Sequence, residues 1–459
     1  MEEKENTENA EMGKRKHSHD TKIVIKYYYE RIRQNTGNFL KWMGLSVLTG
    51  LVVGGASAVF AGCIKAATEY RDTHNWIFTG LANYIKLFQD RIFWTSFRNS
   101  FLVAGVLIVF MYEKIGRQDG GTNQVLATIK SKDDVPFLSA PLIFVSTLLT
   151  HLTGGSAGRE GASIQFGGSI GNWLGKLAHL DEFDHHVMIM CGMSAAFAAV
   201  FGTPMAAAVF AMEVVSVGVM YYAALLPCVI AAIIAAEFAT GMGIDPETFP
   251  VHSIPGLTVG TGLKMALIAV GCGILSILFC ILLKTVGQLY TKYLKNPYIR
   301  IVVAAGVIIL ITIGLNTKDY MGAGSGLIAR AIEKGEARPL DFLWKMLLTA
   351  LTMRAGYRGG EIVPAFSIGA TFGCVAGGIL GFSPELAAAA SMVALFCGVT
   401  NCPITAMLIS FELFGFSGAA YYLIAISISY AVSGYYSLYK DQTIVYSKYK
   451  ARYINRKTR

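Results

Sequence analysis

A glycine-rich loop with a single carboxylate is the part of this sequence best suited to binding an anion. Residues 154–161 read Gly-Gly-Ser-Ala-Gly-Arg-Glu-Gly, and a mostly apolar run follows over residues 162–178. Glycine lets the backbone unwind and approach a ligand, and the apolar run predicts a helix whose N-terminus faces the loop. Unpaired N–H groups and the helix dipole at such an N-terminus favour an anion. We therefore expect Gly158, Arg159 and Gly161 to line an anion site.

Glu160 lies at this predicted helix start, where its carboxylate could occupy the pocket in place of an anion. Once protonated it would leave the pocket and could carry a proton, so one side chain would couple anion and proton movement. A capping acid, or an ion pair with Arg159, is the structural alternative. Because acids inside a membrane are costly and usually functional, we predict that Glu160 is the gating and proton-coupling carboxylate.

A second loop offers a similar helix start. Residues 358–364 read Arg-Gly-Gly-Glu-Ile-Val-Pro, with the proline where a first helical turn tolerates it. Two carboxylates near one anion would repel it unless one of them holds a proton. A structural role for Glu361, by capping or by pairing with Arg358, stays open. The anion-site residues predicted from this loop are Gly360, Glu361, Ile362 and Val363.

Three further loops carry weaker signals. Residues 201–204 read Phe-Gly-Thr-Pro and residues 400–403 read Thr-Asn-Cys-Pro, and both predict a capped helix that starts at proline. Residues 120–123 read Gly-Gly-Thr-Asn, so Thr122 and Asn123 could present hydroxyl and amide donors to a desolvated anion.

The elements that must position these loops form a repeat. A shift of 199 positions pairs the following residues: Arg159 with Arg358, Gly161 with Gly360, Phe197 with Phe396, Val200 with Val399, Pro204 with Pro403, and Glu213 with Glu412. Interrupted apolar segments in both halves indicate a transport site near mid-membrane. We expect an inverted repeat in which the helix N-termini near Gly158, Gly202, Gly360 and Asn401 converge.

Composition places the chain in a membrane. Of its 459 residues 54% are hydrophobic and 15% charged, and apolar runs of about 20 residues, the length of a spanning helix, recur. We expect an all-α multi-pass protein with a tail over residues 1–37, a transmembrane domain over 38–439 with halves 38–240 and 260–439, and a basic tail over 440–459. Positive charge in these tails predicts that both are cytoplasmic in the cell membrane.

Several function classes are not supported by the residues present. The net charge of +9 lies in tails and short loops, so we expect no nucleic-acid partner. The eight cysteines lack metal spacing, and we expect no metal and no cofactor. His151 is the only histidine near the motifs, which argues against an enzyme.

These motifs resemble the CLC family of anion channels and anion/proton antiporters. Residues 158–161, Gly-Arg-Glu-Gly, match the signature around the gating glutamate of that family, and the order of Gly-Thr-Pro, Glu213 and Gly-Gly-Glu-x-x-Pro is similar. The resemblance extends over most of residues 39–439. It implies an inverted repeat of tilted and broken helices, assembled as a homodimer with one pore in each subunit.

Departures from the family pattern favour its bacterial fluoride/proton antiporter branch. Chloride members carry Gly-Ser-Gly-x-Pro where residues 121–125 read Gly-Thr-Asn-Gln-Val, and a second glutamate where Val214 stands. Ala162 replaces the proline of the gating loop, and Glu361 replaces an aromatic residue. The branch commonly has threonine at the position of Val363, so a chloride channel or a chloride/proton antiporter is the alternative.

The resemblance also suggests residues outside the loops. Tyr439 falls where the family places a tyrosine that lines the anion site, with Tyr436 as the rival. Small residues over 187–236 predict close helix packing between two subunits. The expected partners are therefore fluoride or chloride, protons, the lipid bilayer and a second copy of the chain. Whether Glu160 couples an antiporter or only gates a passive channel stays open.

Overall fold

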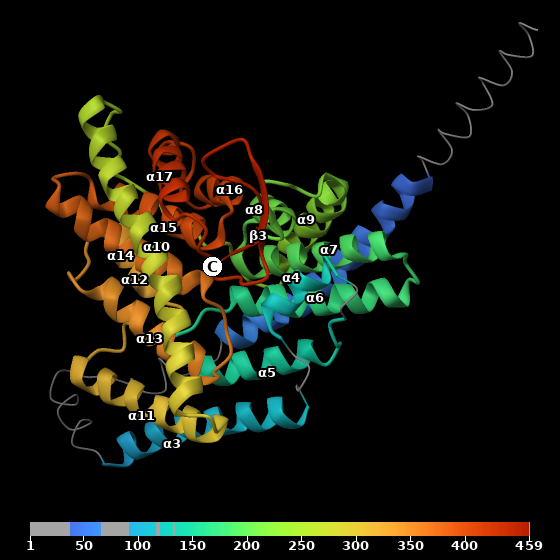
Figure 1. The fold of residues 1–459 in the computed structure, drawn as a ribbon, viewed down its shortest axis with the longest axis horizontal. Coiled ribbons are helices and arrows are strands. Elements are labelled where there is room, and N and C mark those ends of the chain that lie inside the picture. Colours follow the sequence, from blue (N-terminus) through green and yellow to red (C-terminus); the bar gives the residue numbers. More distant parts are fainter. Residues whose placement is uncertain (1–36, 66–90, 116–119, 132–133, 459) are drawn as a thin grey trace, which may run out of the picture.

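A computed structural model describes residues 37–65, 91–115, 120–131 and 134–458 (Figure 1). The expected tail over residues 1–37 lies almost wholly outside these ranges. An unlabelled helix, Gly37–Lys65, comes first. The further helices of the first half are α3 (Arg91–Lys114), α4 (Thr122–Thr128), α5 (Ser139–Leu152), α6 (Glu160–Leu177), α7 (Glu182–Phe201), α8 (Pro204–Glu213), the short 3-10 helix η1 (Tyr222–Ala224) and α9 (Leu225–Gly241).

The second half begins after a connector over residues 242–258. Its helices are α10 (Val259–Tyr293), α11 (Pro297–Leu315), α12 (Ser325–Glu333), α13 (Asp341–Ala355), α14 (Ile362–Ile379), α15 (Pro384–Thr400), α16 (Pro403–Phe414) and α17 (Ala419–Val432). The predicted helical fold is confirmed, with three short strands as an addition: β1 (Ser216–Val217), β2 (Thr443–Tyr446) and β3 (Tyr453–Lys457).

Six of the described helices are long and apolar enough to cross a membrane: Gly37–Lys65, Glu182–Phe201, Tyr222–Gly241, Val259–Tyr293, Pro297–Leu315 and Ile362–Ile379. The other apolar helices, among them α8 and α16, are shorter. Short helices leave backbone ends at membrane depth, which is tolerated only inside protein or beside a water-filled cavity. The broken helices predicted from the glycine and proline interruptions are therefore present.

In both halves, one helix ends at a residue with left-handed backbone conformation and the next helix starts at a proline. Gly202, with φ of 73°, ends α7 in the left-handed region, and Pro204 then starts α8. Asn401, with φ of 60°, ends α15 in the same conformation, and Pro403 starts α16. Glycine and asparagine are the residues that adopt this conformation most readily, and proline suits a first helical turn.

An aromatic column packs the halves together around these breaks. The Phe201 ring lies 5.4 Å from that of Phe366, and the Phe366 ring lies 5.2 Å from that of Phe396. Phe197 stacks on Phe210 within the first half at 5.2 Å. All these side chains are buried. Ring contacts of this kind contribute about 0.5 to 1.5 kcal/mol each beyond burial, so they fix the two halves against each other.

The basic tail is folded onto the helices instead of extending from them. Strand β2 pairs in parallel with β1 and antiparallel with β3, which gives a three-stranded sheet. The Gln442 side chain is fully buried and donates to the carbonyl groups of Val214, 2.9 Å away, and Thr400, 2.7 Å away. These bonds attach the tail to the ends of α8 and α15.

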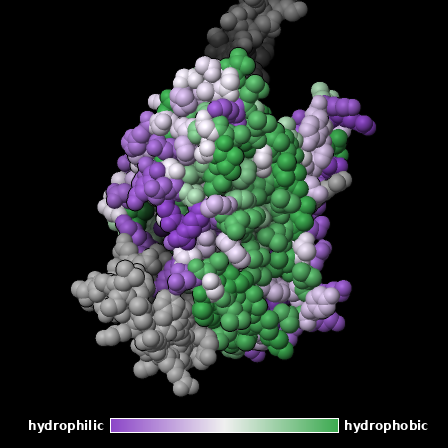
Figure 2. Space-filling view, turned by 90° about the vertical axis from the view of Figure 1, so that its left-hand side faces the viewer, coloured by the Kyte–Doolittle hydropathy of each residue, from purple (hydrophilic) through white to green (hydrophobic). Residues whose placement is uncertain are grey.

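One face of the molecule is broadly apolar, with polar residues along its borders (Figure 2). Helix α10 contributes exposed leucines at helical spacing, including Leu263, Leu267 and Leu278. A face of this kind fits contact with lipid.

The predicted subunit-contact surface over residues 187–236 is partly wrong. Residues 187–201 of α7 are buried inside the subunit, because the small residues there pack against α6. In the remaining part of the surface, α9 exposes large side chains such as Leu225, Leu226 and Ile233.

Candidate functional site

The two glycine-rich loops meet backbone to backbone. Gly158 donates its N–H to the Gly360 carbonyl and Gly360 donates to the Gly158 carbonyl, both at 2.7 Å. A Cβ on Gly360 would lie 2.4 Å from the backbone nitrogen of Gly161, so only glycine allows this approach. The starts of α6 and α14, 202 residues apart at this contact, are therefore joined, as the sequence predicted for Gly158 and Gly360.

Glu160 turns back onto its own loop. Its Oε2 accepts a hydrogen bond from the backbone N–H of Arg159 at 2.9 Å, and its side chain is only 2% exposed. A Cβ on Gly158 would lie 2.7 Å from the same oxygen, so that glycine leaves the space that the carboxylate fills. The carboxylate thus occupies a place where a backbone N–H and the start of a helix would otherwise favour an anion.

Arg159 connects Glu160 to the connector between the halves. Its Nε lies 3.5 Å from Oε1 of Glu160, and its Nη2 lies 3.2 Å from Oε1 of Glu247. The same Nη2 is 3.5 Å from the Val200 carbonyl at the end of α7. Sequence reasoning missed Glu247, because residues 242–258 contain no recognisable motif.

Glu361 does not turn onto its helix. It is the residue before α14, its side chain makes no capping bond, and its Oε1 lies 3.8 Å from Nη2 of Arg354. The side chain is 23% exposed. Of the structural alternatives left open for Glu361, the described contacts show an ion pair, but with Arg354 in the last turn of α13 and not with Arg358. Ile362 and Val363 follow as buried apolar residues of the first turn.

The helix starts at Pro204 and Pro403 each meet the end of the other helix, so the predicted convergence of all four N-termini is wrong. Glu412, at the end of α16, accepts the backbone N–H groups of Met205 and Ala206, each at 2.9 Å. Glu213, at the end of α8, accepts those of Ile404 and Thr405 at 3.0 and 2.8 Å.

Helices α8 and α16 therefore lie antiparallel, each with its first turn capped by the acid that ends the other. A 10-residue helix is about 15 Å long, so the two starts lie far apart. Their N–H groups are already occupied by carboxylates and are not presented to an anion.

The loop at the start of α4 reaches the same region from another side. Thr122 donates its hydroxyl to the Gly161 carbonyl at 3.1 Å, so this donor is used within the protein. Asn123 Oδ1 is buried and has no hydrogen-bond partner among the described residues. Because amide oxygen and nitrogen are assigned from their partners, turning this amide over would present a buried N–H donor at the loop.

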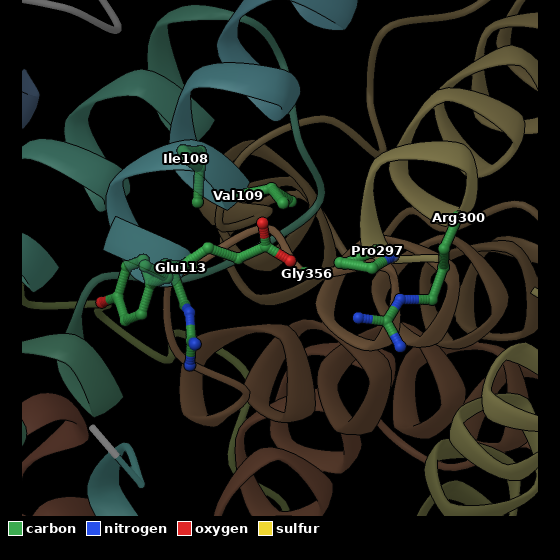
Figure 3. Close-up of a pocket in the computed structure, with 8 residues that line it drawn as sticks. Ile108, Val109, Glu113, Pro297, Arg300 and Gly356 are labelled. Atoms are coloured by element: carbon green, nitrogen blue, oxygen red, sulfur yellow. The ribbon is translucent and has the colours of Figure 1, made fainter. Parts of the chain in front are cut away.

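Arg358 links this loop to a pocket of about 460 Å³. Its guanidinium lies 3.9 Å from the centre of the Tyr112 ring, and its Nη1 lies 3.9 Å from where a Cβ on Gly121 would be. Glu113 and Arg300 project from α3 and α11 on opposite sides of the pocket (Figure 3). The pocket therefore combines two arginines with one carboxylate and reaches the Thr122–Asn123 loop through Arg358.

A buried lysine supports the Glu160 loop from α13, and sequence reasoning missed it. Lys345 is fully buried and donates to Ser156 Oγ at 3.0 Å and to the carbonyl groups of Tyr320 at 3.1 Å and Gly322 at 2.7 Å. Ser156 also shares a hydrogen bond with Thr349. A lysine inside an apolar α13 was the available signal, since buried cations need several acceptors.

The folded tail buries Tyr439 and bonds to its backbone. Tyr439 is buried, and its carbonyl accepts from the Thr458 hydroxyl at 2.7 Å. It belongs to the main apolar core, which also contains Ile362 and Val363. Tyr436 packs in a different cluster. That cluster contains Ala365 and Ile368 of α14, so both rivals pack near this helix and the role of Tyr439 stays a prediction.

A lysine fixes the tail at the end of α15. Lys448 donates to Asn401 Oδ1, to the Tyr430 carbonyl at 3.0 Å and to Ser433 Oγ at 3.1 Å. Burial lowers the pKa of Lys448 to about 8. The charged form of this side chain is thus disfavoured where the tail docks.

Comparisons with known proteins find similar chains along most of this sequence. The family described as voltage gated chloride channel matches residues 104–434. A chloride/fluoride channel protein of Pseudomonas syringae is 33% identical over 420 residues, which cover 89% of this chain and 88% of that protein. An H(+)/Cl(-) exchange transporter of Vibrio cholerae is 25% identical over 394 residues, with 80% and 81% coverage.

Solved structures are also similar to this chain over most of its length. The crystal structure of a CLC-type fluoride/proton antiporter superposes with a TM-score of 0.80 at 29% identity, over 88% of this chain and 98% of that one. A slow cyanobacterial Cl-/H+ antiporter superposes with a TM-score of 0.73 at 17% identity, over 85% and 94%. The second likeness shows the fold alone.

Proposed function

The chain belongs to the voltage gated chloride channel family, the CLC family of anion channels and transporters, and on this premise we propose that it exchanges fluoride for protons. The observation that carries the proposal is the hydrogen bond that the buried Glu160 carboxylate accepts from the backbone N–H of Arg159. Members of this family are channels and transporters and not enzymes. Transport of an inorganic anion follows from membership, whereas fluoride and proton coupling are the proposal.

The Glu160 carboxylate is a tethered competitor for the anion. While ionised, it accepts the Arg159 N–H that a small anion would otherwise accept, and it is held by the Arg159 guanidinium. Protonation removes its charge, so the N–H groups become available and an anion takes the vacated place. When the anion leaves, the proton is released and the carboxylate returns. The ionised carboxylate and the anion therefore take turns on the same N–H group, and each exchange between them binds or releases one proton on Glu160.

Three features support fluoride. The Pseudomonas relative is named for chloride and fluoride, and the solved antiporter is named for fluoride and protons. Fluoride holds water more tightly than chloride, so its site must supply strong donors on dehydration. Asn123, with its partnerless buried amide end, can supply one. Glu361, held by Arg354, is a second carboxylate that would take part on the other side of the Gly158–Gly360 contact.

Chloride is the second candidate substrate. Val363 is buried at the first turn of α14 and adds no side-chain donor, which weakens the argument for fluoride. The Vibrio relative is named as an H(+)/Cl(-) exchanger. A chloride channel or chloride/proton antiporter would use the same fold and the same Glu160.

The pocket beside Arg358 would serve as an approach to the Asn123 loop. Arg300 and Arg358 make its lining basic, and a basic cleft raises the local concentration of an anion. We also propose that the folded tail is cytoplasmic, because lysine and arginine concentrate there. A homodimer in the cell membrane, assembled through the exposed residues of α9, completes the proposal.

Flux measurements on purified protein in liposomes test which anion is transported. Vesicles loaded with fluoride, or with chloride at the same concentration, are diluted into anion-free buffer at lower pH, and a selective electrode records efflux. We expect the proton gradient to drive fluoride out faster than chloride, against a fluoride gradient when one is imposed. Uphill movement of chloride but not of fluoride would assign the alternative substrate, and downhill leak alone would assign a channel.

A further inference from the structure

One arginine is shared by two carboxylates at the site. Arg159 contacts Glu160 at 3.5 Å and Glu247 at 3.2 Å. The exposed fractions of the three side chains rise from 2% for Glu160 to 17% for Arg159 and 26% for Glu247. The three groups thus form a charged chain from the buried pocket toward solvent.

This arrangement has one positive charge for two negative charges. In surroundings that exclude water, a negative charge without its own positive partner is costly. Binding one proton to a carboxylate therefore stabilises the set of three side chains. Glu160 is 2% exposed and Glu247 is 26% exposed, so a negative charge on Glu160 is the more costly of the two. The proton therefore belongs on Glu160, which is the carboxylate that has to release the anion pocket.

The shared arginine also needs support when Glu160 moves. Without a second partner, the guanidinium would follow Glu160 or turn to water. Glu247 and the Val200 carbonyl, 3.5 Å from Nη2, keep it beside the pocket instead. A positive charge that stays in place would favour the incoming anion.

We infer that Glu247 is a positioning residue for proton coupling: it holds Arg159 beside the pocket and thereby sets the pH at which Glu160 exchanges its proton. The inference rests on the proposed function. Among the described residues, the charged groups acting on Glu160 are Arg159 and Glu247. The nearby atoms from the loop before α14, from α14 and from α7 belong to Gly360, Pro364 and Val200, which are uncharged. Asp245, on the same connector as Glu247, is exposed.

The connector offers a matched control. Glu385, at the start of α15, accepts the backbone N–H of Ser253 at 3.0 Å and so also anchors the connector. Among the described residues, Glu385 contacts Ser253 and makes no hydrogen bond or ion pair with Arg159. Glu385→Gln therefore weakens the same segment without changing the charge that faces Arg159, which separates a tethering role from an electrostatic one.

The experiment records fluoride and proton flux from liposomes between pH 5 and 8, in about half-unit steps, for wild type, Glu247→Gln and Glu385→Gln. In Glu247→Gln, Arg159 is left to Glu160 alone, which stabilises the Glu160 carboxylate. The pH midpoint of coupled transport should move to lower pH by roughly one unit, the scale of an opposite charge in contact. Glu385→Gln should keep the wild-type midpoint.

Glu247→Asp provides the second variant. It keeps the charge but draws it back by one methylene, so its midpoint should move in the same direction by less than half as far. If the glutamine variant does not fold, the aspartate variant alone carries the test. Equal shifts in Glu247→Gln and Glu385→Gln, or no shift in either Glu247 variant while wild type is coupled, would overturn the inference. Wild type without coupled flux would overturn the proposed function itself.

Discussion

The starts of α6 and α14 share a backbone arrangement and differ in their chemistry. Their loops exchange two hydrogen bonds through Gly158 and Gly360. On one side, Glu160 is 2% exposed and turns back onto an N–H group of its loop. On the other, Glu361 is 23% exposed and pairs with Arg354. One carboxylate therefore competes with an anion for the helix start, and the other does not.

The paired arginines differ in the same way. Arg159 lies between two acids, whereas its repeat partner Arg358 stacks on the Tyr112 ring at 3.9 Å. The acid Glu247 comes from the connector and Tyr112 comes from α3, so neither belongs to the repeated loops. The repeat thus supplies a similar backbone at the two loops, and segments outside the loops supply the different partners of the two arginines.

Substitution at the shared contact should have the largest effect. A Cβ on Gly360 would lie 2.4 Å from the Gly161 nitrogen and 2.9 Å from its Cα, and backbone atoms cannot move aside without opening the site. Gly360→Ala should abolish transport and destabilise the fold by about 1 to 3 kcal/mol or more. Gly306→Ala in α11, where no atom lies within 4 Å, is the control. Flux and thermal unfolding in detergent measure both, and equal behaviour of the two variants would contradict the close contact.

The reciprocal caps offer a second contrast between the halves. Glu213 is 6% exposed and accepts three bonds, including one from the Thr405 hydroxyl at 2.6 Å, whereas Glu412 accepts two. Glutamine keeps one oxygen and turns an amide donor toward N–H groups. Bonds to a charged group contribute about 1.5 to 3 kcal/mol, so Glu213→Gln should lower the thermal unfolding temperature more than Glu412→Gln. The reverse order would show that burial does not decide the strength of these caps.

A smaller change should follow at the second carboxylate. The Glu361–Arg354 pair is separated by 3.8 Å and is partly exposed, so it contributes less than about 1 kcal/mol to stability. Glu361→Gln should slow fluoride flux by several-fold but keep the number of protons moved per fluoride. Simultaneous pH and fluoride recordings decide this. Loss of coupling in this variant would give Glu361 the role assigned to Glu160.

The smallest effect concerns the docked tail. The pKa of Lys448 is lowered by burial from 10.5 to about 8, so its charged form weakens docking below about pH 8. As pH rises from 8 toward 10.5, the docked side chain loses its proton before the undocked one does, and docking becomes tighter. Hydrogen exchange of strands β2 and β3 should slow over this range beyond its intrinsic pH dependence. Lys448→Met should remove this pH-dependent change.

Local patterns made much of the site predictable. Glycine runs followed by apolar segments identified the two loops, and Pro204 and Pro403 identified the next helix starts, because these residues act through their own backbone conformation. The matches of Glu213 and Glu412 under one shift indicated the repeat. The fold class followed from apolar segment lengths and from the family resemblance.

The remaining features depend on contacts between distant segments. Glu247 and Lys345 approach the Glu160 loop only after folding, at separations of 88 residues from Arg159 and 189 from Ser156. The convergence of four helix starts failed because shift matching does not show which ends of antiparallel helices meet. Burial of α7 was missed because small residues favour close packing within a subunit as much as between subunits.

Glu160→Gln in liposomes is the most direct test of the account. The variant keeps the shape of the side chain and removes its charge and its titration. Proton and fluoride movements are recorded together, beside wild type, after gel filtration has shown the same folded species. We predict that proton-driven fluoride movement is lost in Glu160→Gln. Coupled transport at the wild-type level in this variant would contradict the central role of Glu160.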